Sequence, residues 1–345
     1  MVDLANSSHL AAVFGCSGPV LGTDEQAFFR DADPVGFILF ARNCESPGQV
    51  RSLVRDLRDA VGREDVPVMI DQEGGRVTRL KPPHWRAAPA PGRFGEIARS
   101  SLANAIDAAF LSARLIAADL FDLGISVNCV PVLDVPQPGT SDVVGDRACS
   151  TDVETVIALG AAIAQGMLQG GVLPVIKHMP GHGRAFVDSH HDLPAVAASW
   201  DELVAIDFAP FRALRDLPWG MTGHILLEAI DENSPATASA KVVETVIRGH
   251  IGFDGVLVTD DLSMNALKGS VGERAAAALA AGCDIALHCN GKMDEMIDVA
   301  NSCKPLSDAA IRRIDRGESL RRPPEPFDRA GSAKWLGILL SGKVA

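Results

Sequence analysis

The stretch "GVLVTDDLSM", residues 255–264, contains a short continuous apolar run that ends in two adjacent aspartates. A run of this length without polar alternation is typical of a strand buried on both faces, as in parallel sheets. Seven further runs of this kind occur along the chain. They are "HLAAVFGC" (9–16), "VGFILFA" (35–41), "VPVMIDQ" (66–72), "ISVNCVPVLDV" (125–135), "LPVIKH" (173–178), "WGMTGHIL" (219–226) and "CDIALHCN" (283–290).

Amphipathic segments lie between these runs and predict helices. One follows Ser46 and Pro47, which suit the N-cap and the first helical position. Further helices are predicted from Thr151 with Glu154 and from Ser199 with Glu202, where the spacing is that of a capping box, and over 103–123, 240–249 and 272–281.

Eight predicted strands alternating with helices indicate an α/β protein with a single-domain (β/α)₈ TIM barrel. A doubly wound open sheet is the rival architecture. Since no linker or repeat divides the chain, we expect one catalytic domain over residues 1–345. Residues 305–345, which are rich in proline and arginine before a last helical pattern, are expected to form a C-terminal extension packed on the barrel.

Composition limits the possible partners and the compartment. The 345 residues carry a net charge of -12, which disfavours nucleic acid and anionic membranes as partners. The first residues lack the basic and apolar segments of a signal peptide, and no apolar stretch is long enough to span a bilayer. The seven cysteines contain no CxxC pair. We therefore expect reduced thiols in a cytoplasmic protein.

Polar residues follow the predicted strands at the points where the apolar runs end. In a parallel barrel these ends open on one face, where active sites are built. The set as a whole is more informative than any single member, since strands often end in one or two polar residues. Its members are Asp71, Asp134, Lys177, His178, His224, Asp260, Asp261, His288 and Asn290.

The segment "KHMPGHGRAFVDSHHDLP", residues 177–194, is compatible with three kinds of site. His178 and His182 have the i, i+4 spacing of two metal ligands on a helix, but Pro180 between them disfavours a helix, and no HExxH motif is present. The glycines of "PGHGR" and "DQEGGR" fit no phosphate-binding motif and are more typical of turns. We therefore expect neither a metal site nor a phosphate-binding loop here.

The third kind of site is an acid/base site. Asp188 and His190 lie two residues apart, so the carboxylate can orient the imidazole and raise its pKa. In the strand 255–261, Asp260 shares one face with the valines and Asp261 shares the other face with Leu257. One aspartate is thus expected to point into the barrel mouth as a possible nucleophile. The other, or Ser263, would suit the N-cap of the next helix.

Four motifs in one order resemble a known family. "IDQEGGRVTRL", "KHMPGHGRAFVDSHHDLP", "GFDGVLVTDDLSM" and "AGCDIALHCN" closely resemble the bacterial β-N-acetylglucosaminidase branch of glycoside hydrolase family 3. The resemblance implies a retaining hydrolase that needs no cofactor. It also implies a small-molecule sugar substrate, a terminal β-linked N-acetylglucosamine on a 1,6-anhydro-muropeptide of cell-wall turnover.

The resemblance also assigns site residues. It implies Asp260 as nucleophile, His190 as general acid/base and Asp188 as the residue that orients His190. It assigns sugar binding to residues that match the family motifs. These are Asp71, Arg147, Lys177 and His178.

Two departures from the family pattern and several alternatives stay open at this point. Met179 stands where phenylalanine is expected, and Ala148 and Cys149 stand where serine and phenylalanine are usual, next to Arg147. Gly181 and Gly183 are expected to let the loop that carries His190 move. The alternatives are a phosphorylase of the same glycosides, a broader exo-β-glycosidase, a metal-dependent hydrolase, and a sugar-binding barrel without catalysis.

Overall fold

Eight parallel strands form one nearly closed barrel in the structure, a computed structural model that describes residues 9–139, 144–186 and 192–342. The strand order is β10-β1-β2-β3-β4-β5-β7-β9. The two end strands meet where the backbone N–H of Thr259 donates to the carbonyl of Ile285 at 3.0 Å. The strands are β1 (Leu10–Gly15), β2 (Pro34–Leu39), β3 (Val68–Ile70), β4 (Val127–Asn128), β5 (Leu173–Met179), β7 (Trp219–Thr222), β9 (Val256–Val258) and β10 (Ala286–His288).

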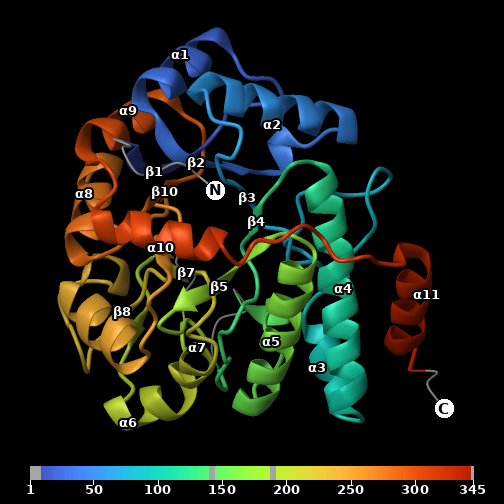
Figure 1. Ribbon diagram of the computed structural model, residues 1–345. Helices are drawn as coiled ribbons and strands as arrows, with labels where there is room; N and C mark the ends of the chain where they lie inside the picture. Colours follow the sequence, from blue (N-terminus) through green and yellow to red (C-terminus); the bar gives the residue numbers. More distant parts are fainter. Residues whose placement is uncertain (1–8, 140–143, 187–191, 343–345) are drawn as a thin grey trace.

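This arrangement confirms the predicted (β/α)₈ barrel and all eight predicted strands. The doubly wound alternative is wrong, because strand order follows chain order and β10 returns to pair with β1. The helices lie around the barrel (Figure 1). They are α1 (Thr23–Ala32), α2 (Pro47–Val61), α3 (Gly92–Ala98), α4 (Leu102–Asp122), α5 (Val153–Gln169), α6 (Trp200–Glu202), α7 (Ala209–Ala213), α8 (Val271–Ala281), α9 (Met293–Ser302), α10 (Asp308–Glu318) and α11 (Arg329–Leu340), with 3₁₀ turns η1 (Ala41–Asn43), η2 (Gly145–Arg147) and η4 (Ala236–Ala238) and π-helical segments η3 (Leu203–Asp207) and η5 (Val242–His250).

Of the helix starts predicted at Ser46, Thr151 and Ser199, two are confirmed and one is wrong. Ser46 caps α2, and the Ser199–Glu202 capping box begins α6, both as predicted. The prediction that Thr151 caps α5 is wrong by one residue. Asp152 takes the N-cap, and its carboxylate accepts the backbone N–H three residues on. Both side chains are good caps, so composition alone does not decide between neighbours.

The barrel interior is apolar, and α10 closes the barrel at the N-terminal ends of its strands. Val256 and Val258 point inward, whereas Leu257 packs against the surrounding helices, which confirms the predicted alternation. Ala310 and Ile314 of α10 pack against the interior side chains. In Figure 1, α10 lies across the front of the barrel, so this view looks at the strand N-termini.

The rest of the C-terminal region lies outside the barrel. Helix α11 packs against α3 and α4 and lies at the edge of the molecule (Figure 1). The predicted division of the chain at residue 305 stays a prediction. A small sheet that the sequence did not predict pairs β6 (Ala195–Val196) with β8 (Leu226–Leu227).

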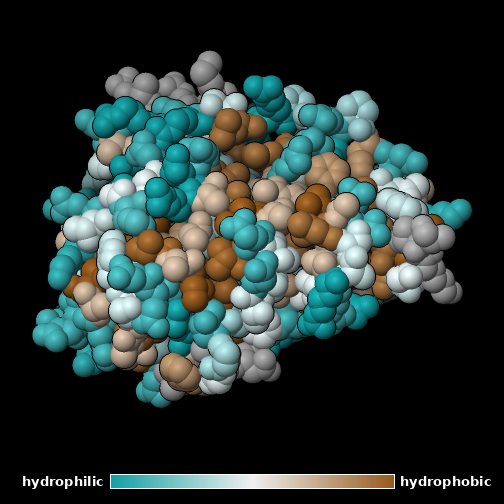
Figure 2. All heavy atoms as spheres, turned by 90° about the horizontal axis from the view of Figure 1, so that it is seen from below, coloured by the Kyte–Doolittle hydropathy of each residue, from teal (hydrophilic) through white to brown (hydrophobic). Residues whose placement is uncertain are grey.

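The outer surface is mixed in character. On the face seen from below, hydrophobic side chains gather across the middle, with hydrophilic ones around them (Figure 2). Such mixtures are ordinary for folded proteins. Within the described parts of the chain, no helix combines the length and the apolar character needed to cross a bilayer.

Candidate active site

A cavity of about 270 Å³ opens at the C-terminal ends of the barrel strands. Its wall combines a polar side and an apolar side. The polar lining residues are Asp71, Glu73, Arg79, Arg147, Lys177, His178, His182, Asp260 and Asp261, and the apolar ones are Ile38, Phe40, Val77, Val144, Met221, Met264, Leu287 and Cys289. Five of the residues noted at strand ends line this cavity, namely Asp71, Lys177, His178, Asp260 and Asp261, whereas Asp134, His224, His288 and Asn290 are not among its lining residues.

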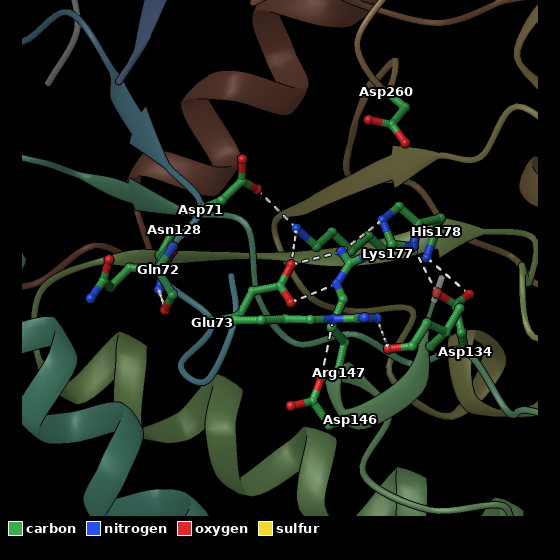
Figure 3. Close-up of polar contacts among 12 residues, drawn as sticks. Asp71, Gln72, Glu73, Asn128, Asp134, Asp146, Arg147, Lys177, His178 and Asp260 are labelled. Carbon is green, nitrogen blue, oxygen red and sulfur yellow. Dashed lines mark hydrogen bonds and ion pairs between the residues drawn. The ribbon is translucent and has the colours of Figure 1, made fainter. Parts of the chain in front are cut away.

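Four alternating charges form a chain along the polar side (Figure 3). Lys177 Nζ lies 2.9 Å from Asp71 Oδ1 and 2.7 Å from Glu73 Oε1. Arg147 donates to both Glu73 oxygens, at 2.9 Å from Nε and 2.8 Å from Nη2. Each of the four groups therefore has a partner of opposite charge, which offsets the cost of burying these charges.

These ion pairs keep all four groups charged. Burial alone would raise the pKa of the Asp71 carboxyl, but Lys177 and Arg79 hold it well below its usual range. Burial would likewise lower the pKa of Lys177, but Asp71 and Glu73 raise it above its ordinary value. The cations of this wall can donate hydrogen bonds to sugar hydroxyls, and the carboxylates can accept hydrogen bonds from them, without any change of protonation near neutral pH.

His178 is held by a second buried carboxylate. Its Nδ1 lies 2.6 Å from Asp134 Oδ2, and its own backbone N–H and that of His182 donate to Asp134 Oδ1 at 3.2 and 2.7 Å. Burial raises the pKa of Asp134, but His178 lowers it more, to about 2. Nδ1 of His178 donates to the ionised carboxylate, and Nε2, on the other side of the ring, lies 3.4 Å from Arg147 Nη2.

Asp260 lies apart from this charge chain (Figure 3). Its Oδ1 accepts the backbone N–H of Asp261 at 2.8 Å, and the structure pairs it with no cation among the described residues. Burial would raise the pKa of Asp260, but the nearby His178 and His224 hold it below its usual value. The carboxylate is thus ionised and open to the cavity.

Asp261 has a local structural role as well as lining the cavity. It accepts from the backbone N–H and the hydroxyl of Ser263 at 3.1 and 2.6 Å, and from the backbone N–H of Cys289 at 3.2 Å. The expectation that Asp261 or Ser263 caps the next helix is wrong. Helix α8 begins later, with Ser270 as its N-cap.

Two further histidines lie at this end of the barrel. His224 is buried between Thr237 Oγ1, 2.8 Å from Nδ1, and the carbonyl of Asp261, 3.0 Å from Nε2. Burial lowers the pKa of His182 to about 4, so its imidazole is neutral near neutral pH. The described residues contain no group of three or more His, Cys, Asp or Glu that could hold a metal ion.

The glycines between His178 and the following loop serve close packing. A Cβ at Gly183 would lie 2.1 Å from the carbonyl oxygen of Val135, and one at Gly181 would lie 2.8 Å from the Cβ of Asp207. Gly181 also has a φ of +137°. This segment is packed against its neighbours, so the hinge role that we expected for these glycines is not supported.

The cavity gathers every predicted site residue that the structure describes. Asp71, Arg147, Lys177, His178 and Asp260 all line it. Their catalytic and binding roles stay predictions. The two remaining assignments, Asp188 and His190, lie outside the described residues.

Sequence reasoning missed three residues of this site. Glu73 lies in the motif "DQEGGR" two positions after Asp71, but no role was given to it. Asp134 was noted only as a strand end, and Arg79 was not singled out. The one available signal was position, since Glu73 and Arg79 follow the same strand end as Asp71. The partners of Glu73 and Asp134 come from distant parts of the chain, whereas Arg79 pairs with nearby Asp71.

Comparison with known proteins now identifies the family. Residues 22–316 match the model of the glycosyl hydrolase family 3 N terminal domain. The chain belongs to glycoside hydrolase family 3. This glycoside hydrolase is similar to curated β-hexosaminidases, which supports hexosaminidase activity and disfavours a non-catalytic sugar-binding barrel.

Individual relatives agree with this assignment. A β-hexosaminidase of Methylococcus capsulatus is 39% identical over 282 residues, which are 81% of this chain and 82% of the relative. One of Bordetella avium is 36% identical over 304 residues, 86% of each chain. A crystal structure of NagZ from Neisseria gonorrhoeae with N-trifluoroacetyl-D-glucosamine superposes with a TM-score of 0.86 at 29% identity, covering 96% of this chain and 98% of the other.

Proposed function

We propose that this glycoside hydrolase is a retaining exo-β-N-acetylglucosaminidase that removes terminal β-linked N-acetylglucosamine from muropeptide fragments. The observation that carries the proposal is the ionised Asp260 carboxylate at the cavity wall, paired with no cation among the described residues. A carboxylate held this way suits a nucleophile, because it stays charged and its oxygens are available to the sugar.

In the proposed first step, Asp260 attacks the anomeric carbon and the glycosidic bond breaks. His190, oriented by Asp188, gives its proton to the departing oxygen. In the second step His190 takes a proton from water, whose oxygen attacks the anomeric carbon and releases Asp260. The two groups must stand about 5 Å apart for this retaining course. Both loop residues lie outside the described part of the chain, so their roles rest on the family motif.

The sugar itself would bind to the charged wall opposite Asp260. Asp71, Arg147, Lys177 and His178 present oxygen acceptors and N–H donors to the cavity. The NagZ relative was crystallised with an N-acylated glucosamine, which supports the same sugar class here. The muropeptide leaving group is inferred from the family resemblance alone.

The proposed setting is the cytoplasm, where cell-wall fragments are recycled. All seven cysteines are free thiols, which suits a reducing compartment. We propose that the enzyme needs no metal or cofactor and that neither nucleic acid nor a membrane is a partner.

The test uses purified protein and 4-nitrophenyl β-N-acetylglucosaminide, with wild type, Asp260→Ala, and Asp201→Ala as a matched change of an exposed aspartate. Each is assayed with and without inorganic phosphate. Activity lost only in Asp260→Ala supports the proposal. Equal activity in Asp260→Ala rejects it. Formation of the sugar 1-phosphate would replace hydrolysis by phosphorolysis.

The acid/base assignment needs a separate variant. His190→Ala should still form the glycosyl-enzyme from an activated aryl glycoside, since that leaving group needs little protonation. Intact-protein mass spectrometry would detect the trapped sugar. Near-normal turnover of a muropeptide by His190→Ala would refute the role of His190.

A further inference from the structure

Glu73 lines the cavity, but it is the most deeply buried member of the charged wall. It follows Asp71 by two positions, beyond the end of β3, and its side chain is completely buried, whereas that of Asp71 is 14% exposed. A buried carboxylate is costly unless cations and hydrogen bonds satisfy it. The partners of Glu73 therefore indicate what it is for.

Those partners are two cations from separate parts of the chain. Arg147 comes from η2, and Lys177 comes from β5. Arg147 Nη2 and Lys177 Nζ both contact Glu73 Oε1, at 2.8 and 2.7 Å, while Arg147 Nε holds Oε2 at 2.9 Å. One carboxylate thus fixes the spacing between two groups that line the cavity (Figure 3).

Arg147 depends on this contact more than Lys177 does. Lys177 is anchored by a barrel strand and has Asp71 as a second anion. The segment of Arg147 is held near Val144 and Asp146 by Arg76, which contacts the Val144 carbonyl and the Asp146 carboxylate. None of these contacts reaches the guanidinium of Arg147, whose hydrogen-bond partners among the described residues are Glu73 and His178.

The electrostatics of Arg147 and Lys177 also indicate that Glu73 holds the two cations together. Burial would lower the pKa of Arg147, but Glu73 raises it above its ordinary value. Arg147 in turn disfavours the charged form of Lys177, which shows that the two cations lie close enough to repel. Without the Glu73 charge, Lys177 would keep its ion pair with Asp71, but Arg147 would lose its carboxylate partner.

We infer that Glu73 is a positioning residue that holds Arg147 and Lys177 at the spacing needed to bind the sugar. This inference rests on the proposed function, since it takes the two cations as sugar ligands. The carboxylate must be both charged and long enough to reach both partners. The direction of the Arg147 side chain is then set by Glu73 and not by its chain neighbours Ala148 and Cys149.

Steady-state kinetics on 4-nitrophenyl β-N-acetylglucosaminide test the inference with Glu73→Gln, Arg147→Ala and the double variant. Glu73→Gln keeps the shape of the side chain but removes its charge. We expect kcat/KM to fall about 100-fold, the usual scale for a misplacement near 1 Å, mainly through KM. The double variant should be no worse than Arg147→Ala by more than about threefold, because residues that act through one another are not additive.

The pH profile gives a readout that a purely structural role would not move. Glu73→Gln removes one of the two anions that favour charged Lys177. The fall of kcat/KM that follows loss of the Lys177 proton, at a pH above the limb set by His190, should therefore shift to lower pH. The matched control is Glu154→Gln, an exposed residue of α5, which should leave both kcat/KM and the pH of this fall unchanged.

Glu73→Asp covers the case in which Glu73→Gln does not fold. It keeps the charge but is one methylene shorter, so it cannot reach both cations, and a similar loss of kcat/KM is expected. Wild-type kinetics in either variant, or losses that multiply in the double variant, overturn the inference. Asp260→Ala separates the two proposals. If Asp260→Ala keeps wild-type turnover, the proposed function fails. If Asp260→Ala is inactive but Glu73→Gln has wild-type kinetics, only the role of Glu73 is rejected.

Discussion

The two ends of the barrel are built from the same strands but from opposite chemistry. At the N-terminal end, Ile314 and Ala310 of α10 close an apolar interior. At the C-terminal end, buried charges such as Lys177 and Glu73 line a cavity. The first end gains stability from burial of apolar surface, and the second holds charges that water would otherwise solvate. Changes at the two ends should therefore separate stability from activity.

The largest effect is expected from Asp260→Asn at the cavity end. The amide keeps the shape but cannot form the glycosyl-enzyme, so kcat should fall about 10⁴-fold or more. The melting temperature should change little, because the carboxylate has no cation partner among the described residues and its hydrogen bond to the Asp261 N–H can be kept by the amide oxygen. Kinetics and thermal denaturation of the same preparation check this. A large loss of stability would show that Asp260 serves the fold.

Ile314→Ala should give the opposite result at the other end. Ile314 is 1% exposed, and truncation of such a side chain costs about 3 kcal/mol of unfolding free energy. At a temperature where the variant is folded, kcat/KM should stay within twofold of wild type. Ile297→Ala, on the exposed side of α9, is the matched control. A parallel fall in kcat/KM would show that the two ends are coupled.

Asp134→Asn should affect both properties. The amide can donate to His178 Nδ1, which would place the proton on Nε2 against Arg147. We expect kcat/KM to fall about 10- to 100-fold, a usual cost for loss of the group that orients a functional histidine. Kinetics at neutral pH, where Asp134 of the wild type is ionised, check this.

The same variant makes a prediction about stability and pH. The folded pKa of Asp134 is about 2, below its unfolded value near 3.8. Its ionised form therefore stabilises the fold above about pH 4, by about 2 kcal/mol, and this contribution is lost as the pH falls toward 2. Denaturant titrations should show that the difference between wild type and Asp134→Asn shrinks over this range. A constant difference would contradict the cause assigned to the pKa.

The smallest effect is expected from Met179→Phe, which restores the family residue. Met179 is fully buried, and its Cε would lie 3.0 Å from a Cβ at Gly220. Because the glycine leaves little spare room beside Met179, a larger ring must shift the surrounding atoms, at a cost of about 1 to 2 kcal/mol. Met179→Leu, of similar volume, should cost less. Urea denaturation measures both. A gain of stability with phenylalanine would show that the packing here is loose.

The fold could be predicted because its signal is local. Each barrel strand is a continuous apolar run such as 173–178, and the polar residues at the strand ends reach one face by the geometry of parallel strands. The β6–β8 pair could not be predicted, since two-residue strands carry no pattern. The choice of Asp152 over Thr151 as a cap was likewise undetermined, because both are suitable neighbours.

The site was predicted only as far as strand ends and family motifs extend. Asp71, Lys177 and His178 follow strands, so their convergence was foreseeable. Glu73 and Asp134 act through partners 74 and 44 residues away, Arg147 and His178. No periodicity in the sequence records such pairs. Asp188 and His190 were assigned from a motif and stay predictions.

The closure of the barrel by late residues bears on how the chain is made. The first strand pairs with β10, and Leu306 donates its backbone N–H to the carbonyl of His9. During synthesis, β1 therefore cannot pair with β10, and α10 cannot cover the apolar interior of the barrel, until almost the whole chain has left the ribosome. Until α10 emerges, the nascent protein exposes a strand edge of the kind that chaperones shield from aggregation.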